Sequence, residues 1–475
     1  MSVAEYARLG FGESPETVID DVVVQGTLPD WLTGTLLRNG PGTFHVGTER
    51  YRHWFDGLAM LHRFTIQGGK VSYASRFLEG RTRDEATTTG RIPYSEFATD
   101  PCRSLFARTA AVFHREVTDS AKVNITRVAD RFLALAETPI QVAFDPVTLR
   151  STGVIGWDDS DFGRMTTVHP HLDEARDEGF NLVTRYGASS SYVLRRFRTT
   201  DPSIATETHA SRRVAEPAYI HSFGMSSRHL VIAEFPFVVN PLSLLLWLRP
   251  YIENFRWKPN RGTRFHVFDR ATGRSVATFE TDAFFAFHHV NAYDDGDDLV
   301  VDLVAYDDAS IIESFYIDRL ENADNVLPEG RLRRFRLPVA GPSRAVSTEA
   351  LADTSLELPS FDVSRMNTRA DHRYVYGVGV HDRRGFYDQL VKVDLVDGTA
   401  RTWHEPDCYP GEGVFVGRPG REAEDDGVVL AVVLDQARGT SFLLVLDAGS
   451  FTERARATLP HPVLFGYHGQ FYAAP

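Results

Sequence analysis

The chain has 475 residues, of which 43% are hydrophobic, so it can hold two or three ordinary domains or one large all-β domain. A net charge of −13, without a long run of basic residues, argues against a nucleic-acid-binding protein. The two cysteines, Cys102 and Cys408, exclude a disulfide scaffold, and residues 1–20 lack an apolar core, so we expect a cytoplasmic protein without a secretory signal.

One pattern recurs along the chain: an apolar strand, then Asp or a polar turn, then a second strand. It appears at Gln141–Pro146, Phe265–Gly273, Leu390–Leu395 and Leu443–Gly449. Strand–turn–strand units at intervals of tens of residues predict an all-β fold, with a β-propeller favoured. The irregular period leaves a sandwich or two β-domains open. The chain contains no low-complexity linker, which favours one domain over residues 1–475.

The segment Phe235–Ile252 is strongly apolar but is interrupted by prolines such as Pro241 and Pro250. It is too short and too broken to span a bilayer comfortably. A local basic cluster lies at its end and just beyond it, formed by Arg249, Arg256, Lys258 and Arg261. Two interpretations stay open: a peripheral membrane patch, or an ordinary buried loop or core helix.

The stretch Phe284–Tyr293 and the apolar run Leu299–Tyr306 flank an acidic turn, which predicts a β-hairpin. The first strand carries the adjacent pair His288 and His289. Because successive strand side chains point to opposite faces, a regular strand directs one of the two at a given site. Taken alone, such a residue is more often a hydrogen-bonded core histidine than a ligand.

Four histidines share this setting among aromatic or β-branched residues: His169, His221, His288 and His468. Their successive separations are 52, 67 and 180 residues, which excludes a local zinc-finger clip and suits a site where separate strands converge. Converging imidazoles would favour zinc, copper, iron or nickel over magnesium or calcium. Buried carboxylates that orient such ligands are expected near them, and the candidates beside apolar runs are Glu137, Glu357 and Glu412.

Several short motifs, spread in order from about residue 20 to the end, resemble the carotenoid cleavage oxygenases. They are Leu36–Gly42, His53–Gly57, His169–Pro170, Tyr219–Gly224, Phe287–Asn291, Glu405–Asp407, Glu424–Gly427 and His468–Gly469. The chain looks most similar to the animal-type branch, which contains β-carotene central-cleavage oxygenases and the visual-cycle retinoid isomerase. The resemblance implies a seven-bladed β-propeller with a helical and loop cap over a hydrophobic tunnel.

The resemblance also implies Fe(II) on the propeller axis. Its ligands would be His169, His221, His288 and His468, the family pattern selecting His169 over His171 and His288 over His289. Glu137, Glu357 and Glu412 match the glutamates that orient three of the ligands. We expect Phe55, Tyr219, Phe287 and Tyr467 to line the tunnel, with plain core packing as the alternative.

The implied activity is cleavage of a carotenoid double bond by O2, with central (15,15′) cleavage of β-carotene to retinal as the first candidate. An apocarotenoid- or stilbene-type dioxygenase is the alternative, although Ala136 stands where stilbene cleavers have a lysine. Ala136 also departs from the threonine of the isomerase, which weakens a retinyl-ester isomerohydrolase. A propeller that binds a partner protein without catalysis is the alternative from a different class.

The loop Asp100–Phe106, which contains Cys102, resembles a membrane-facing loop of the animal enzymes. Together with Phe235–Ile252 it predicts peripheral membrane contact, which would let an apolar substrate enter without crossing water.

Overall fold

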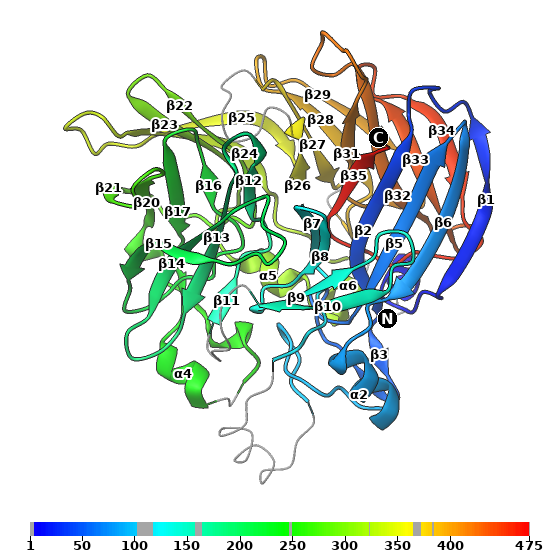
Figure 1. The fold of residues 1–475 in the computed structure, drawn as a ribbon, viewed down its shortest axis with the longest axis horizontal. Coiled ribbons are helices and arrows are strands. Elements are labelled where there is room, and N and C mark those ends of the chain that lie inside the picture. The colour runs from blue at the N-terminus through cyan, green and yellow to red at the C-terminus, as the bar shows by residue number, and fades with distance from the viewer. Residues whose placement is uncertain are drawn as a thin grey trace.

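The computed structural model describes residues 4–101, 117–156, 164–246, 249–322, 324–363, 372–381 and 384–474. Nearly all of its regular structure is β-strand, and the sheets are arranged like the blades of a propeller (Figure 1). The predicted all-β, propeller-like architecture is therefore confirmed.

The two ends of the chain meet in one ten-stranded sheet. In order across that sheet, its strands are β30 (Cys408–Pro410), β32 (Gly427–Asp435), β33 (Thr440–Asp447), β34 (Glu453–Thr458), β1 (Thr17–Gly26), β6 (Lys70–Phe77), β5 (Leu58–Gln67), β2 (Gly34–Thr43) and β35 (Gly469–Ala473), with β31 (Val414–Gly417) paired to β32. The last strand of the chain, β35, pairs antiparallel with β2, so that Arg38 lies opposite Gly469. In Figure 1 the red C-terminal strand therefore lies beside the blue N-terminal ones.

Five further sheets contain four or five strands each. They are formed by β7–β10 (Asn124–Val128, Arg131–Leu135, Ile140–Phe144, Ser151–Gly156), by β11–β15 (Arg164–Thr166, His171–Asp173, Glu178–Arg185, Ser191–Phe197, Glu207–Arg213), by β16, β17, β20 and β21 (Gly224–Met225, His229–Glu234, Thr263–Asp269, Ser275–Thr281), by β22–β25 (His289–Asp295, Asp298–Ala305, Arg331–Pro338, Ser347–Ser355), and by β26–β29 (Glu357–Ser360, Tyr374–Gly379, Gln389–Asp394, Ala400–His404).

The expected count of seven blades is wrong for the described residues. They contain five separate sheets of the size of a blade, and a sixth sheet that is twice as large. The physical reason is that β1 pairs with β6 along its first part and with β34 along its last four residues. This shared strand hydrogen-bonds the first and last strands of the chain into a single sheet.

In the residues that the structure describes, the α-helices are few and short. They are α1 (Glu5–Gly10), α2 (Arg81–Thr89), α4 (Pro241–Leu246), α5 (Ser310–Ser314) and α6 (Ile317–Leu320), and two further strand pairs are β3 (His45–Val46) with β4 (Glu49–Arg50) and β18 (Phe237–Val238) with β19 (Arg256–Trp257). The expected helical cap is not confirmed by these elements. In the described parts of the chain, every helix is too short or too polar to cross a bilayer.

The predicted hairpin is confirmed as β22 and β23, with Asp295 opposite Asp298 at its turn. The strand pairing is irregular between His289 and Asn291, close to where β22 begins. His288 lies immediately before this strand, so it belongs to the loop at the strand's start.

Candidate metal centre and cavity

Four histidines from separate sheets converge on one point. His169 lies between β11 and β12, His221 precedes β16, and His288 and His468 directly precede β22 and β35. One ring nitrogen from each lies within 4.8 Å of the others. The Nε2 atoms of His169 and His221 are 3.2 Å apart, and those of His288 and His468 are also 3.2 Å apart.

Three of these rings each donate a hydrogen bond from Nδ1 to a glutamate. The Nδ1–H of His221 donates to Glu137 at 2.7 Å, that of His288 to Glu357 at 3.0 Å, and that of His468 to Glu412 at 2.8 Å. An Nδ1–H bond of this kind fixes the tautomer, so the Nε2 lone pair of each ring faces the shared point. The structure brings together all four predicted ligands and all three predicted glutamates.

Each glutamate receives a second donor, which fixes its own orientation. The Tyr219 hydroxyl donates to Glu137 at 2.7 Å, the Leu358 N–H donates to Glu357 at 3.2 Å, and the Gly469 N–H donates to Glu412 at 2.8 Å. The buried guanidinium of Arg38 lies 4.0 Å from Glu412. The rings are therefore positioned by a rigid polar shell rather than by their own rotamers alone.

The neighbouring histidines His171 and His289 face elsewhere. His171 donates to the carbonyl of Phe223 at 2.7 Å, and Nδ1 of His289 bonds the Ser222 hydroxyl at 2.8 Å. His288 and His289 therefore point to different partners, as expected, although His288 lies in the loop before β22 rather than within the strand.

The donor set fits a divalent transition metal. Burial, followed by the charges that His468 and His221 would carry, lowers the pKa of His169 well below its ordinary value. Burial likewise lowers the pKa of His221, although the hydrogen bond to Glu137 opposes it. His288 and His468 both donate Nδ1–H to a glutamate, so their neutral rings direct Nε2 lone pairs at each other across 3.2 Å, an arrangement that a cation between them would relieve. Imidazole donors suit iron, zinc, copper and nickel.

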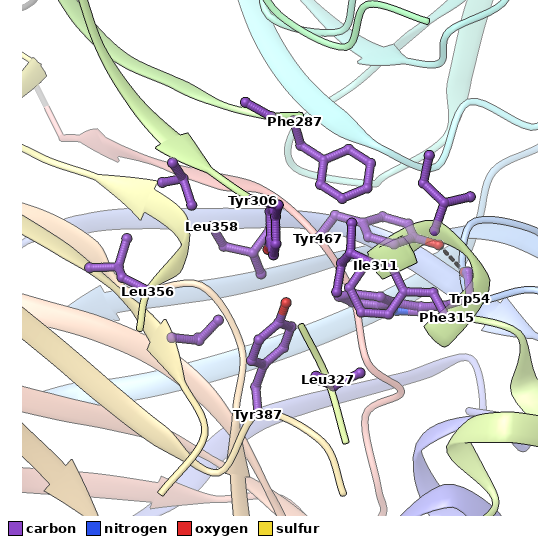
Figure 2. Packing of buried hydrophobic residues seen from close by; sticks show 14 of the residues in the cluster. Trp54, Phe287, Tyr306, Ile311, Phe315, Leu327, Leu356, Leu358, Tyr387 and Tyr467 are labelled. Atoms are coloured by element: carbon purple, nitrogen blue, oxygen red, sulfur yellow. Dashed lines mark hydrogen bonds between the residues drawn. The ribbon is translucent and has the colours of Figure 1, made fainter. Parts of the chain in front are cut away.

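A cavity of about 200 Å³ opens beside the histidines, and His221, His288 and His468 form part of its wall. The wall is mainly apolar and aromatic, with Trp54, Phe55, Phe97, Phe287, Phe315 and Leu358 among its residues. Figure 2 shows Trp54, Phe287, Phe315 and Tyr467 packed next to one another. The centroids of the Trp54 and Phe315 rings are 4.9 Å apart, and those of Trp54 and Tyr467 are 5.3 Å apart.

Three of the four predicted tunnel residues line this cavity: Phe55, Phe287 and Tyr467. The fourth, Tyr219, is buried outside the cavity wall, and its hydroxyl donates to Glu137, which is itself a lining residue. Sequence reasoning missed Phe97 and Phe315, which the fold brings in from distant loops, and the polar pair Glu96 and Lys122. Trp54 belongs to the motif His53–Gly57 but was not predicted as a cavity residue.

The segment Phe235–Ile252 contributes to the same cavity. Phe235, Val239 and Ile252 are buried, whereas Leu242 in α4 is 60% exposed. Pro241, Leu244, Arg249 and Tyr251 line the cavity. Cys102 and most of its loop lie outside the described residues.

Comparison with known proteins agrees with this geometry. Residues 11–473 match the family model described as retinal pigment epithelial membrane protein. The human β,β-carotene 15,15′-dioxygenase is 33% identical, with 97% of this chain and 94% of that protein covered. The carotenoid isomerooxygenase of Galleria mellonella is 34% identical, with 94% and 92% covered. The solved structure of the cobalt-substituted Synechocystis apocarotenoid oxygenase superposes with a TM-score of 0.87 at 26% identity over both whole chains.

Proposed function

Because this chain belongs to the carotenoid oxygenase family of the retinal pigment epithelial membrane protein, and is a dioxygenase of that family, we propose that it uses Fe(II) and O2 to cleave a double bond of a carotenoid. The first candidate reaction is central cleavage of β-carotene, the reaction for which the human relative is named. The observation that carries the proposal is the convergence of four histidines beside an apolar cavity, with His221, His288 and His468 in its wall.

We propose His169, His221, His288 and His468 as the iron ligands, oriented through Glu137, Glu357 and Glu412. Iron, when bound, would supply the redox chemistry that joins dioxygen to a carbon–carbon double bond. Four neutral ligands leave the positive charge of the ion uncancelled in its immediate shell. A relative, the Synechocystis apocarotenoid oxygenase, has been solved in a cobalt-substituted form, which supports a metal-dependent activity for this chain.

The chain's own contribution is positioning. The aromatic wall, with Phe55, Phe287 and Tyr467, would hold the polyene by dispersion and hydrophobic burial and exclude water from it. The C=C bond of a polyene held beside the three lining histidines would break, and each of its two carbons would become a carbonyl carbon that takes one oxygen atom of O2. The reaction then balances without a further reductant.

Product analysis tests this proposal directly. We expect the iron-loaded protein, incubated with β-carotene in detergent under air, to release retinal, and to release none when oxygen is removed. Two unequal apocarotenals would keep the chemistry and move the cleaved bond. Turnover restricted to shorter apocarotenoids or stilbenes would favour the alternative dioxygenase, and oxygen-independent conversion of a retinyl ester would favour the isomerohydrolase.

We propose that residues 1–475 form a single domain, since β34 and β35 pair with β1 and β2 from the other end of the chain. Leu244 and Tyr251 line the cavity from α4 and the segment after it, and we propose that this part of the chain covers the substrate.

We also propose that the protein is cytoplasmic and touches membranes peripherally through α4 and the loop near Cys102. Leu242 of α4 is 60% exposed. The basic cluster beside it is partly neutralised, since Lys258 and Arg261 both pair with Glu216, at 2.7 and 2.9 Å. Contact would therefore depend more on apolar burial than on charge.

We expect Leu242→Ser to lower binding to phosphatidylcholine vesicles several-fold, because one leucine contributes roughly 1.5–3 kcal/mol on burial. Vesicle flotation measures the bound fraction. Val18→Ser, in β1 at the opposite side of Figure 1 and 67% exposed, is the matched control and should bind as the unaltered protein does. Equal binding by all three proteins would count against contact through α4.

A further inference from the structure

A buried ion pair interrupts the apolar wall of the cavity. The ammonium Nζ of Lys122 lies 2.7 Å from Oε2 of Glu96, and both residues line the cavity. Their side chains are only 4% and 3% exposed. Burial raises the pKa of Glu96, while the charge and hydrogen bond of Lys122 and the Thr118 hydroxyl lower it.

Such a pair is a poor device for stability. Removing two charges from water costs several kcal/mol, and apolar residues of the same size often serve a fold as well or better. The pair also lies close to the reactive centre, since Lys122 is followed by Val123, whose carbonyl accepts the backbone N–H of His468 at 3.3 Å. Its position in the cavity beside the histidines indicates a role toward the substrate.

The hydrogen bonding of the two buried lysines differs. Lys392 donates to Asp425, to the carbonyl of Ala448 and to that of Gly449, at 2.6, 2.7 and 3.2 Å. An ammonium has three N–H donors, so Lys392 is fully satisfied. Among the described residues, Lys122 has two acceptors, Glu96 at 2.7 Å and a long contact to the Ser120 carbonyl at 3.4 Å. The third N–H of Lys122 can therefore donate a hydrogen bond to a molecule in the cavity.

Two other polar groups next to the pair are used by the protein itself. The Thr118 hydroxyl donates to Glu96 at 2.8 Å, and the Ser120 hydroxyl donates to the carbonyl of Gly57 at 3.1 Å. Lys122 therefore keeps a charged N–H donor for a molecule in the cavity beside the histidines. Because Glu96 already balances its charge, a carboxylate ligand would be repelled by Glu96, whereas a neutral oxygen would not.

We propose that Lys122, held in place by Glu96, binds a neutral hydroxyl, aldehyde or ketone oxygen at one end of the polyene. Oxygenated carotenoids or apocarotenoids are then preferred over the hydrocarbon β-carotene, which fits the same cavity but offers Lys122 no oxygen. This inference rests on the proposed cleavage of a polyene and names the substrate class for it. Lys122 is a specificity-determining residue in this scheme and takes no part in the redox chemistry.

The test compares three substrates: an apocarotenal, the apocarotenol obtained by reducing it, and β-carotene. Lys122→Met alone would leave Glu96 buried without a partner, so the variant is the double substitution Glu96→Gln with Lys122→Met. A hydrogen bond to a charged group contributes about 1.5–3 kcal/mol, so we expect kcat/KM for the two oxygenated substrates to fall on the order of 10-fold or more. The change should appear in KM, and the ratio of kcat/KM for either oxygenated substrate to that for β-carotene should fall by the same factor.

The matched control is Lys392→Met with Asp425→Asn, which removes the other buried lysine pair away from the cavity and should leave all substrate ratios unaltered. A second readout, quenching of tryptophan fluorescence in the metal-free protein, gives the Kd of each ligand without turnover. Selective loss of apocarotenal binding with no cleavage of any polyene would refute the proposed function and keep this inference. Equal Kd and kcat/KM ratios in the double variant and the unaltered protein would overturn it.

Discussion

We expect His288→Ala to abolish both metal binding and polyene cleavage while leaving the fold intact. The substitution removes one of four converging ring nitrogens. Loss of a hydrogen-bonding partner of a ligand already costs about 10–100-fold in metal affinity or activity, so loss of the ligand itself should exceed 100-fold. Since β22 begins at His289, the pairing of β22 with β23 does not depend on the imidazole. Metal analysis, product formation and circular dichroism measure the three quantities.

His266→Ala is the matched control, because His266 is also buried and lies near a glutamate, Glu234, at 3.5 Å, but outside the cluster. The His266→Ala protein should bind as much metal as the unaltered protein. The cost of leaving Glu357 buried in His288→Ala is reduced by the Leu358 N–H, which still donates to it. Full metal content and full turnover in His288→Ala would exclude His288 as a ligand.

The second large effect concerns the carboxylate behind that ring. Glu357→Gln keeps the size of the side chain and an acceptor oxygen for the Nδ1–H of His288, but it removes the negative charge. With a neutral partner at Nδ1, the Nε2 lone pair of His288 is less basic and binds a metal more weakly. We therefore expect metal affinity or turnover to fall by about 10–100-fold. Competition with a chelator gives the affinity.

Glu234→Gln is the corresponding control, since it alters a buried carboxylate whose histidine, His266, faces no cluster. An unchanged metal affinity in Glu357→Gln, with Glu234→Gln also unchanged, would show that the orientation of His288 does not depend on this charge. A parallel loss in both variants would indicate a general loss of stability, which thermal unfolding would reveal.

The sequence by itself determined the residue types that carry the chemistry and the local structure around them. Two apolar runs on either side of an acidic turn predicted the hairpin of β22 and β23, because strand and turn preferences are local properties. The choice of His288 over His289 came from the family resemblance, since alternation along a strand says only that the two side chains diverge. The family motifs identified four histidines and three glutamates that the structure places together.

The tertiary structure decided what depends on contacts between distant segments. The sharing of β1 between β6 and β34 could not be read from the repeated strand pattern, because that pattern does not say which strands pair. Tyr219 is aromatic and lies two residues before His221, yet it is buried outside the cavity wall and donates to Glu137, 82 residues away, a contact that only the fold creates. Glu96 and Lys122 are 26 residues apart, and each alone resembles a surface charge. Only the folded chain, which buries both against an apolar cavity, makes them a pair.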